Sequence, residues 1–466
     1  MESKRPVDHP TGTYPPGTAA IEKLRQGLRG DLIIPGDAVY DEARRVWNGA
    51  IDRRPALIVY CVDANDVIQA VTFARTHNCL VAVRSGGHNV AGLSVCDAGM
   101  VIDLSRMKRI AVDPVSSVAH AEAGLSLGEF DTATQAYGLA TTMGVNSDTG
   151  IAGLTLGGGF GKLGRKYGLT CDNLIAADVV TADGRLLRAS AADHSDLFWG
   201  LRGGGGNFGI VTAFEYALHP VGPSLLVGSV LHRYDQAREA IRFYDDFARK
   251  APDELSVDAA LVTMQSGERF FSVSACYVGP PESGKPILAP LMTFGTPVES
   301  SLGAIPYLQI QSKGDAIFPR GRRYYWKAQF LNEISSSAID ALLEAYAGAP
   351  SATSLLVFQQ VGGAIARVPK SAAPYANRDA LYDCFPIAIW DDHADDEANI
   401  QWARAMWSAI RPYATSGVYA NNLGDEGDDR VRQAYGENYA RLVALKTKYD
   451  PANLFRLNQN IPPNAS

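Results

Sequence analysis

Val81-Ala82-Val83-Arg84-Ser85-Gly86-Gly87-His88-Asn89-Val90-Ala91-Gly92 is the stretch of the chain that is most informative about its fold. It begins with alternating β-branched residues, which is typical of a buried strand. It then breaks into two glycines and a histidine. A glycine pair permits positive φ and leaves backbone amides exposed, and successive amides of this kind can bind an anion. The stretch therefore predicts a strand and a ligand-binding loop, although a tight turn with a surface histidine fits this segment equally well.

Two further glycine-rich stretches follow along the chain. The first runs from Gly144-Val145-Asn146-Ser147-Asp148-Thr149-Gly150-Ile151-Ala152-Gly153 to Gly157-Gly158-Gly159-Phe160-Gly161. The second is Arg202-Gly203-Gly204-Gly205-Gly206-Asn207-Phe208-Gly209-Ile210-Val211. Ordering so many glycines is costly in backbone entropy. Close approach of the chain to a large, flat ligand that carries phosphates would explain why the sequence tolerates this cost.

The C-terminal part of the chain adds a third kind of motif. It contains Tyr419-Ala420-Asn421, Tyr449-Asp450-Pro451-Ala452-Asn453-Leu454-Phe455-Arg456 and Asn458-Gln459-Asn460-Ile461. Together, these motifs resemble the FAD-linked oxidases of the vanillyl-alcohol oxidase superfamily, in the berberine-bridge-enzyme-like branch. The resemblance implies an α+β protein of two domains, in which a PCMH-type FAD-binding fold is joined to a substrate domain built on an antiparallel sheet. A C-terminal segment returns to the flavin domain. The expected boundaries are 1–220 (core about 52–220), 221–410 and 411–466.

The composition limits the class of protein. The chain has 466 residues, 46% of them hydrophobic, and is too long for one ordinary domain, so we expect two. A formal net charge of −7 argues against nucleic-acid binding. No apolar segment typical of a signal peptide or a membrane span is present. We therefore expect a cytoplasmic monomer or homodimer that binds no membrane. Six scattered cysteines without a CxxC pair predict neither a disulfide framework nor a metal site.

The first half of the chain predicts alternating strands and helices. Strands are expected at 56–61, 79–83, 101–104 and 118–123, and helices at 19–28, 40–47, 67–77 and 127–137. Asp63 can cap the third of these helices, and Gly138 can end the fourth. A hairpin is expected to join 174–181 to 185–189 through Asp183-Gly184. Because the glycines follow the second strand of the β-α-β unit, the pattern departs from a Rossmann site.

The pattern changes at His219-Pro220-Val221-Gly222-Pro223, which we interpret as a domain boundary. Beyond it, strands are expected at 225–234, 257–263, 270–278, 323–330, 355–361 and 382–390, with helices at 236–249, 337–347, 398–410 and 436–448. The polar and aromatic alternation of these strands is typical of an antiparallel sheet with one face toward a cavity. Tyr324, Trp326, Phe330 and Trp390 are candidates for an aromatic pocket, together with a share of the core.

The resemblance assigns cofactor contacts to all three glycine-rich stretches and to the tail. The residues expected to contact FAD are Arg84, Ser85, Gly86, Gly87, His88, Asn89, Gly92, Gly144, Val145, Asp148, Thr149, Gly150, Gly153, Gly158, Gly159, Gly161, Asn173, Gly209, Val211, Tyr419, Asn421, Asn458 and Asn460.

His88 matches the histidine that many relatives bond to the 8α-methyl group of the isoalloxazine ring. The resemblance therefore implies a covalent 8α-histidyl link, and the alternative is a histidine that only lines the flavin. Some relatives add a second link through a cysteine in a Gly-x-Cys-x-x-x-Gly context. Asn146 occupies that position here, and a carboxamide cannot form a thioether. We therefore expect FAD held by one covalent bond.

Four residues are expected to act on the substrate: Tyr419, Asn421, Gln360 and Thr149. In some relatives the tyrosine of the Tyr-x-Asn element is the base. That role requires either a pKa below the usual value of about 10 or a partner that accepts the proton. The alternative is a hydrogen bond to the flavin alone. Gln359-Gln360 stands where relatives often present a carboxylate, and glutamine cannot act as a base. Thr149 either controls oxygen access or makes a packing contact.

The expected activity is that of an oxidase. A hydride passes from a small organic substrate (an alcohol, an amine or a hydroxylated ring) to FAD, which O2 reoxidises with release of H2O2. Two alternatives remain open. One is a polyketide or aromatic oxygenase that uses flavin-bound oxygen, and the other is a flavin carrier without turnover.

Overall fold

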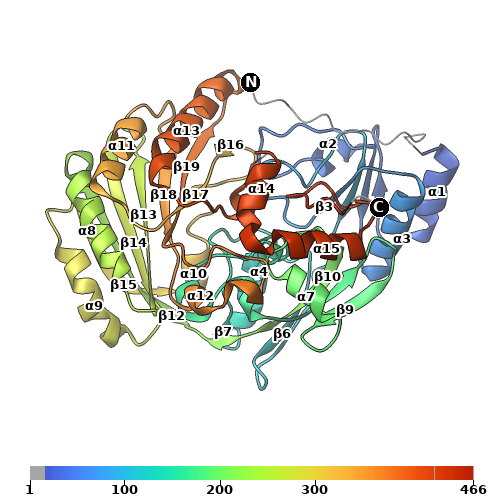
Figure 1. Ribbon diagram of the computed structural model, residues 1–466, viewed down its shortest axis with the longest axis horizontal. Coiled ribbons are helices and arrows are strands. Elements are labelled where there is room, and N and C mark those ends of the chain that lie inside the picture. Colours follow the sequence, from blue (N-terminus) through green and yellow to red (C-terminus); the bar gives the residue numbers. More distant parts are fainter. Residues whose placement is uncertain (1–15, 425, 465–466) are drawn as a thin grey trace.

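The computed structural model describes residues 16–424 and 426–464, so the expectation about a signal peptide, which concerns Met1 to Pro10, lies outside them. Within the described residues the strands form sheets of four, five, two and eight strands. Figure 1 shows the largest sheet and its helices at the left and the sheets of the first half of the chain at the right. This mixture of helices with a large antiparallel sheet confirms the predicted α+β class.

The four-stranded sheet carries the first glycine-rich loop. Its strands lie in the order β1 (Leu32–Ile33), β2 (Leu57–Tyr60), β4 (Met100–Asp103) and β3 (Val81–Arg84). Strands β2 and β3 are both parallel to β4. Helix α3 (Ala64–Thr76) connects β2 to β3, and the Asp63 side chain accepts hydrogen bonds from two amides of its first turn. The predicted β-α-β unit is therefore present, with the glycine-rich loop at the carboxyl end of β3.

The five-stranded sheet packs beside it in one continuous core. Its order is β5 (Ile110–Asp113), β6 (Val118–Glu122), β10 (Ile210–Ala217), β8 (Leu174–Val180) and β9 (Leu186–Ser190). Strands β8 and β9 form the predicted hairpin. Helix α4 (Leu127–Gln135) begins with a capping box, in which Ser126 and Glu129 each accept the other's backbone amide. A two-stranded sheet pairs β7 (Leu139–Ala140) with β11 (His219–Pro220).

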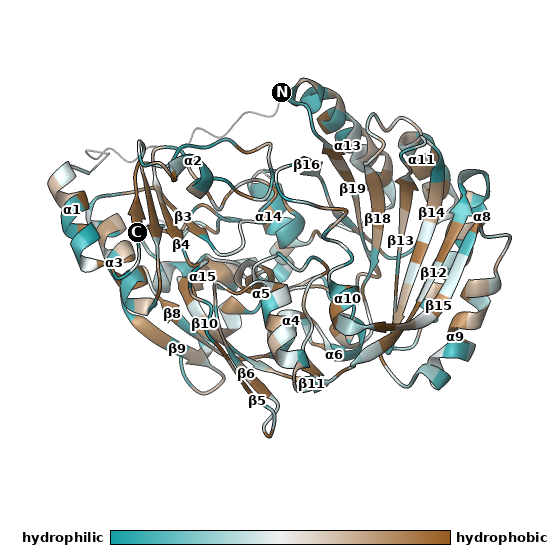
Figure 2. Ribbon diagram, turned by 180° about the vertical axis from the view of Figure 1, so that it is seen from behind, coloured by the Kyte–Doolittle hydropathy of each residue, from teal (hydrophilic) through white to brown (hydrophobic). Residues whose placement is uncertain are grey.

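The eight-stranded sheet belongs to the second half of the chain. Its order is β15 (Glu299–Pro306), β12 (Ser224–Arg233), β14 (Arg269–Tyr277), β13 (Leu255–Thr263), β18 (Leu355–Gln360), β19 (Tyr382–Trp390) and β16 (Arg323–Trp326), and β17 (Gln329–Leu331) also pairs with β19. Helices α8 (Ala237–Arg249), α9 (Pro281–Thr293), α11 (Ser336–Tyr346) and α13 (Asp396–Ile410) cover one face and form a second core with it. Figure 2 shows β18 and β19 in brown, as expected for strands with a buried apolar face.

The other helices are short or join the two halves. They are α1 (Thr18–Gly27), α2 (Tyr40–Ala43), α5 (Ile151–Leu156), α6 (Gly164–Tyr167), α7 (Ser195–Leu201), α10 (Tyr307–Gln311), α12 (Ala364–Arg367), α14 (Asp428–Tyr435) and α15 (Tyr439–Tyr449). No helix of the described residues is both long and apolar enough to cross a membrane. The six cysteines are buried thiols without disulfide bonds.

Three predicted elements differ from the observed ones, and the observed α9 and β15 were not predicted. The helix predicted at 40–47 ends at Ala43, and the helix predicted at 436–448 consists of a 3-10 turn followed by α15. The strand predicted at 323–330 divides into β16 and β17. Helix α9 has no counterpart in the prediction because two prolines lie inside it. Strand β15 also went unpredicted, because its edge position leaves most of its side chains exposed and removes the alternation of buried and exposed residues.

The C-terminal segment returns to the first half of the chain, as predicted. Helices α14 and α15 and residues 454–461 share the core of the two smaller sheets. The fully buried Lys446 pairs with Asp450 at 2.6 Å. Its ammonium group also donates to the carbonyl oxygens of Asn207 and Phe455, each at 2.9 Å. Because removing one partner of a buried ion pair is strongly destabilising, this lysine holds the tail against the glycine-rich loop before β10.

The loop after β3 touches the loop before α5 through the two backbones. A Cβ atom built on Gly86 would lie 2.2 Å from the amide nitrogen of Gly150. A Cβ atom on Gly150 would lie 2.4 Å from the amide nitrogen of Gly86. No side chain fits at either position, so the contact of these two loops requires both glycines.

We expect Gly86→Ala to lower the free energy of unfolding by about 1–3 kcal/mol, the usual cost of overpacking, because the atoms it would strike belong to backbone. Urea unfolding of the purified protein measures the loss. Gly303→Ala is the matched control, since a Cβ atom on Gly303 meets nothing within 4 Å. Equal stability of the two variants would contradict the proposed contact.

Candidate active site

His88 lies in a cluster of polar and aromatic groups. Its Nε2 atom lies 2.8 Å from Oδ1 of Asp148, and its Nδ1 atom lies 3.5 Å from Oγ1 of Thr149. Its ring stacks on Trp47 with the centroids 4.9 Å apart. Burial lowers the pKa of His88, and the neighbouring Asp148 offsets this only in part. The imidazole is therefore neutral near pH 7, and the close approach of Asp148 favours the tautomer with the proton on Nε2 and the lone pair on Nδ1.

Arg320, from the second half of the chain, holds Asp148 in place. Its Oδ2 atom lies 3.2 Å from Nε of Arg320, and Nη2 of Arg320 donates to the carbonyl oxygen of Gly86 at 2.6 Å. Burial raises the pKa of Asp148, but His88 and Arg320 outweigh it and the net direction is downward. The carboxylate therefore stays ionised. Arg320, in the segment between α10 and β16, thus fixes both glycine-rich loops at once.

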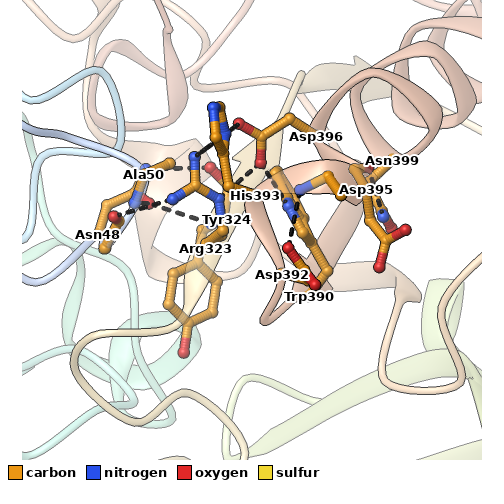
Figure 3. A network of polar contacts seen from close by, with 12 residues as sticks. Asn48, Ala50, Arg323, Tyr324, Trp390, Asp392, His393, Asp395, Asp396 and Asn399 are labelled. Carbon is orange, nitrogen blue, oxygen red and sulfur yellow. Dashed lines mark hydrogen bonds and ion pairs between the residues drawn. The ribbon is translucent and has the colours of Figure 1, made fainter.

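Trp47 is held over His88 by strand β16. Its indole stacks on Tyr324 with the centroids 3.8 Å apart. The Asn48 side chain accepts the backbone amide of Tyr324 and donates to its carbonyl oxygen, each at 3.0 Å. Figure 3 shows Asn48 beside Tyr324 and Arg323, whose guanidinium pairs with Asp396. This network joins the loop that carries Trp47 to the large sheet.

Tyr419 and Asn421 meet the glycine-rich stretch that follows α5. The Tyr419 hydroxyl oxygen accepts hydrogen bonds from the amide of Gly159 at 2.9 Å and from Nδ2 of Asn421 at 2.8 Å. Nδ2 of Asn421 also donates to the carbonyl oxygen of Leu154 at 3.1 Å. Burial raises the pKa of Tyr419, and these two hydrogen bonds offset only part of the rise. The direction is opposite to the lowered pKa that was one of the two expected routes to a base, so Tyr419 is a neutral phenol.

Glutamines 359 and 360 lie on opposite faces of β18. Oε1 of Gln360 accepts the amide of Val257 at 2.8 Å, and its Nε2 donates to the carbonyl oxygen of Ala248 at 2.6 Å. Both ends of this carboxamide are therefore used within the helix-covered side of the sheet. This corrects the expectation that Gln360 contacts the substrate. Gln359 is the member of the pair on the inner face, toward the first half of the chain.

Several residues expected to contact a cofactor use their side chains within the protein. The Arg84 guanidinium forms a buried ion pair with Asp103. Nδ2 of Asn173 donates to two carbonyl oxygens, and its Oδ1 lies 2.7 Å from Nε2 of His219. The Val211 side chain lies in the core. A contact of Arg84, Asn173 or Val211 with a cofactor therefore has to come from backbone atoms.

The Ser85 and Asn89 side chains are also used locally. Oγ of Ser85 donates to the carbonyl oxygen of Ala123 at 2.6 Å, and Oδ1 of Asn89 accepts the amide of Leu93 at 3.1 Å. Both contacts shape the loop around His88. Val145, also among the expected contacts, is 38% exposed.

The glycines expected to contact FAD fall into two groups. Cβ atoms would come within 1.6–3.3 Å of other protein atoms at Gly86, Gly92, Gly144, Gly150, Gly158, Gly159, Gly161 and Gly209. These positions are explained by contacts of the chain with itself. A Cβ atom on Gly153 would meet nothing within 4 Å, and one on Gly87 would meet nothing closer than 3.5 Å. Open space therefore borders Gly87 and Gly153, where a ligand can approach the backbone.

Two asparagines of the tail lie beside another open glycine. Nδ2 of Asn458 donates to the carbonyl oxygens of Gly206 and Phe455 at 3.1 and 3.0 Å. Oδ1 of Asn458 and Oδ1 of Asn460 are buried and have no partner among the described residues. A Cβ atom on Gly206 would meet nothing within 4 Å. Buried oxygens without a donor call for an additional group, so the tail and the glycine-rich loop fit a bound cofactor rich in hydrogen-bond donors and acceptors.

The predicted aromatic set divides between three places. Tyr324 and Trp326 lie with Trp47, and Phe330 lies in a cluster with Phe160, Tyr375 and Tyr419. Trp390 belongs to the core on the helix-covered side, where its indole donates to Asp396 at 2.7 Å. Three of the four residues therefore lie near the candidate site, and Trp390 does not.

Sequence reasoning missed Trp47, Arg320 and Asp383. Trp47 and Arg320 lie in irregular segments, where no periodicity or motif distinguishes them. Asp383 lies within the correctly predicted strand 382–390. An aspartate near the start of an otherwise largely apolar strand is a signal that could have identified it, because a buried carboxylate is rare unless it is paired.

Comparison with known proteins gives the family. The model of the FAD binding domain matches residues 55–190, and the model described as berberine and berberine like matches residues 418–462. An FAD-linked oxidoreductase of Dictyostelium discoideum is 33% identical, over 96% of this chain and 97% of its own length. The chain belongs to the berberine-bridge-like FAD-linked oxidoreductases. The (R)-6-hydroxynicotine oxidase of Paenarthrobacter nicotinovorans is 30% identical, over 94% of this chain and 98% of its own.

Solved structures show the same fold. The 6-hydroxy-D-nicotine oxidase of Arthrobacter nicotinovorans superposes with a TM-score of 0.88 at 27% identity, over 94% of this chain and 98% of the other. A berberine-bridge-like protein of Physcomitrella patens gives 0.87 at 23% identity, over 96% and 100%. The PCMH-type fold is therefore confirmed, and this berberine-bridge-like protein is an FAD-dependent oxidoreductase.

We expect Tyr419→Phe to lower the free energy of unfolding by about 1–3 kcal/mol, because the Gly159 amide and the Asn421 carboxamide lose a buried acceptor. Urea unfolding measures the change. Tyr137→Phe, at an exposed tyrosine, is the control. If both variants unfold at the same urea concentration, the Tyr419 hydroxyl is not a structural acceptor.

Proposed function

We propose that this protein is an oxidase that carries FAD on a single covalent bond to His88 and oxidises a small alcohol, amine or hydroxylated ring. FAD, when bound, accepts the hydride and is reoxidised by O2, which yields H2O2. The observation that carries the proposal is the neutral, half-buried His88, which lies between Asp148 and Trp47 at the junction of the glycine-rich loops.

His88 has the properties of a nucleophile. Formation of a histidyl bond requires a neutral imidazole with a free lone pair, held in one orientation. Oδ1 of Asp148 lies 2.8 Å from Nε2 and so favours the tautomer whose lone pair is on Nδ1, on the side of the ring away from Asp148. Stacking on Trp47 restricts rotation of the ring. Asp148 therefore acts as the orienting partner, and Arg320 keeps that carboxylate in place.

A single bond is supported by the residues around Asn146. Its carboxamide oxygen is buried without a partner among the described residues, and it cannot form a thioether. The six thiols are buried, and burial raises the pKa of Cys61, Cys79, Cys96, Cys171, Cys276 and Cys384. Thiols held in the protonated form are poor nucleophiles.

The substrate class follows from the relatives and from the inner face of the large sheet. The names of similar proteins cover a hydroxylated N-heterocycle, a chitooligosaccharide and other carbohydrates. In this chain the inner face near the candidate site carries Trp326, Phe330, Val357 and Phe385. These aromatic and apolar side chains favour a flat, weakly polar ring such as a hydroxylated heterocycle over an open carbohydrate.

The activity test uses three compounds: (R)-6-hydroxynicotine, chitobiose and glucose. Anaerobic mixing with a substrate is expected to bleach the flavin absorbance, and admission of O2 is expected to restore it with one H2O2 per turnover. A flavin that none of a wider panel of alcohols, amines and hydroxylated rings bleaches would indicate a carrier without turnover. Incorporation of labelled oxygen into the product, without H2O2, would indicate an oxygenase.

The covalent bond is tested on a denaturing gel after acid precipitation. Yellow fluorescence is expected to travel with the wild-type polypeptide, and His88→Ala is expected to release all its FAD. Asp148→Asn is expected to form the bond more slowly, because a carboxamide can turn its donor toward Nε2 and disturb the tautomer. His120→Ala, at a histidine on strand β6 with its side chain 58% exposed, is the control and should keep the bond. Flavin that washes out of the wild-type protein would overturn the proposal.

A further inference from the structure

The inner face of the large sheet is only partly covered by protein along β18 and β19. Along β18 and β19 the side chains alternate: Phe358 and Tyr382, on the helix-covered side, are buried, whereas Gln359 and Phe385, on the inner face, are only half-buried. Central strands of a large sheet expose side chains only where something other than protein lies against them. The inner face therefore borders the space available to a substrate.

Asp383 lies on this inner face beside Gln359. The register of the sheet pairs Asp383 with Gln359 on β18 and with Phe330 on β17. Strand β18 has no carboxylate at Gln359, but Asp383 places one directly opposite that residue on the neighbouring strand β19. Cross-strand neighbours of this kind have Cβ atoms about 4.5–5.5 Å apart, so Asp383 can act in the region where a carboxylate on β18 would have acted.

The Asp383 carboxylate is only half satisfied. Its Oδ2 atom accepts a hydrogen bond from Nδ2 of Asn422 at 2.6 Å. Its Oδ1 atom is buried without a partner, and no basic side chain of the described residues pairs with it. The Tyr375 hydroxyl, which belongs to the cluster of Phe330 and Tyr419, is also buried without a partner. Two unsatisfied polar atoms in one buried region indicate a place where a polar group of a ligand is received.

We propose that Asp383 accepts the proton that the substrate releases on oxidation. This inference rests on the proposed oxidase function. As the C–H bond breaks and its electron pair leaves as hydride to FAD, the substrate O–H or N–H proton passes to Oδ1 of Asp383, directly or through one water molecule. The product gains a C=O or C=N bond, and Asp383 becomes a neutral carboxylic acid. Tyr419 stays protonated and serves as a donor.

The titration of Asp383 suits this role. Burial raises its pKa from 3.8 to about 7, and the hydrogen bond from Asn422 offsets only part of the rise. A general base is most effective when its pKa lies near the working pH. The titratable groups near Asp383 are Tyr375 and Tyr419 of the inner-face cluster and its strand neighbour Cys384, and burial raises the pKa of each, so they stay neutral over the range in which Asp383 ionises.

The decisive variant is Asp383→Asn, which keeps the shape of the side chain and the acceptor for Asn422. Anaerobic rapid mixing uses whichever of (R)-6-hydroxynicotine, chitobiose or glucose bleaches the wild-type flavin fastest. The wild-type rate of flavin reduction is expected to rise with pH through about 7, as Asp383 ionises. Asp383→Asn is expected to lower this rate by about 10²–10⁴-fold and to abolish the rise, as expected for loss of a general base.

Asp131→Asn is the matched control. Asp131 on α4 is also fully buried, its Oδ1 also lacks a partner, a single glutamine amide donates to its Oδ2, and burial raises its pKa to about 7. It lies beside Tyr307, which packs against β12 and β14, away from the part of the large sheet formed by β18 and β19. Its variant should therefore keep both the rate of flavin reduction and the rise with pH.

A stability measurement separates a chemical role from a structural one. A carboxylate with a raised pKa in the folded state costs stability as the pH rises from 3.8 through about 7. Both aspartate variants are therefore expected to have a higher Tm than the wild type at pH 8 and a similar one at pH 4. Only Asp383→Asn should combine the gain in Tm with slow flavin reduction, and a merely structural aspartate would not produce that combination.

The outcomes distinguish this inference from the proposed function. If the wild-type flavin is bleached and Asp383→Asn bleaches within about twofold of it with the same pH dependence, well below the range for a general base, Asp383 is not the acceptor and the oxidase function stands. Equal slowing of the Asp131 and Asp383 variants would also overturn the assignment. If no compound of the wider panel of alcohols, amines and hydroxylated rings bleaches the wild-type flavin, the oxidase function itself fails. In that case, infrared difference spectra still test the titration: the carboxylic acid C=O band lost between pH 5 and 9 should be weaker in Asp383→Asn.

Discussion

The site depends on one steric constraint, the backbone contact between Gly86 and Gly150. It brings the loop that carries His88 against the loop that carries Asp148 and Thr149, at a separation that no side chain permits. Arg320 then connects both loops, through Asp148 and the Gly86 carbonyl oxygen. The geometry of the histidine is therefore set by backbone packing first and by charge second, and neither loop could hold it alone.

Buried ion pairs fix the second half of the chain and the tail onto this frame. Arg378 binds Asp172 through two hydrogen bonds, at 2.6 and 2.8 Å, and Lys162 pairs with Asp258 on the inner face of the large sheet. Lys446 holds the tail. Such pairs contribute little net stability compared with apolar contacts, because both charges lose their hydration. Their geometry is specific, however, and they determine which loop faces which strand, as a site shared between distant segments requires.

The sequence predicts the parts of the fold that rest on local periodicity and turn chemistry. The β-α-β unit, the hairpin at Asp183-Gly184 and the central strands of the large sheet follow from alternation, capping and glycine. It could not predict α9, whose prolines resemble a loop, or β15, which is exposed at the edge. The site divides in the same way: His88 and Tyr419 lie in motifs, whereas Trp47 and Arg320 reach the site through contacts between distant segments. The sequence also does not show which residues of β18 point to the inner face, so Gln360 was expected where Gln359 lies.

The two carboxylates near the site show how one fold can separate two tasks. The pKa of Asp148 is held down by His88 and Arg320, whereas burial without a cation raises the pKa of Asp383 to about 7. Environments that push the pKa values of two similar groups apart are typical of sites that divide acid and base roles. An ionised Asp148 can orient an imidazole permanently but is too weak a base to take a proton. Asp383 can exchange a proton near neutrality, and it does so where the sheet leaves one of its oxygens without a partner. Keeping that carboxylate unpaired costs stability, which a purely structural core would avoid by placing an apolar residue there.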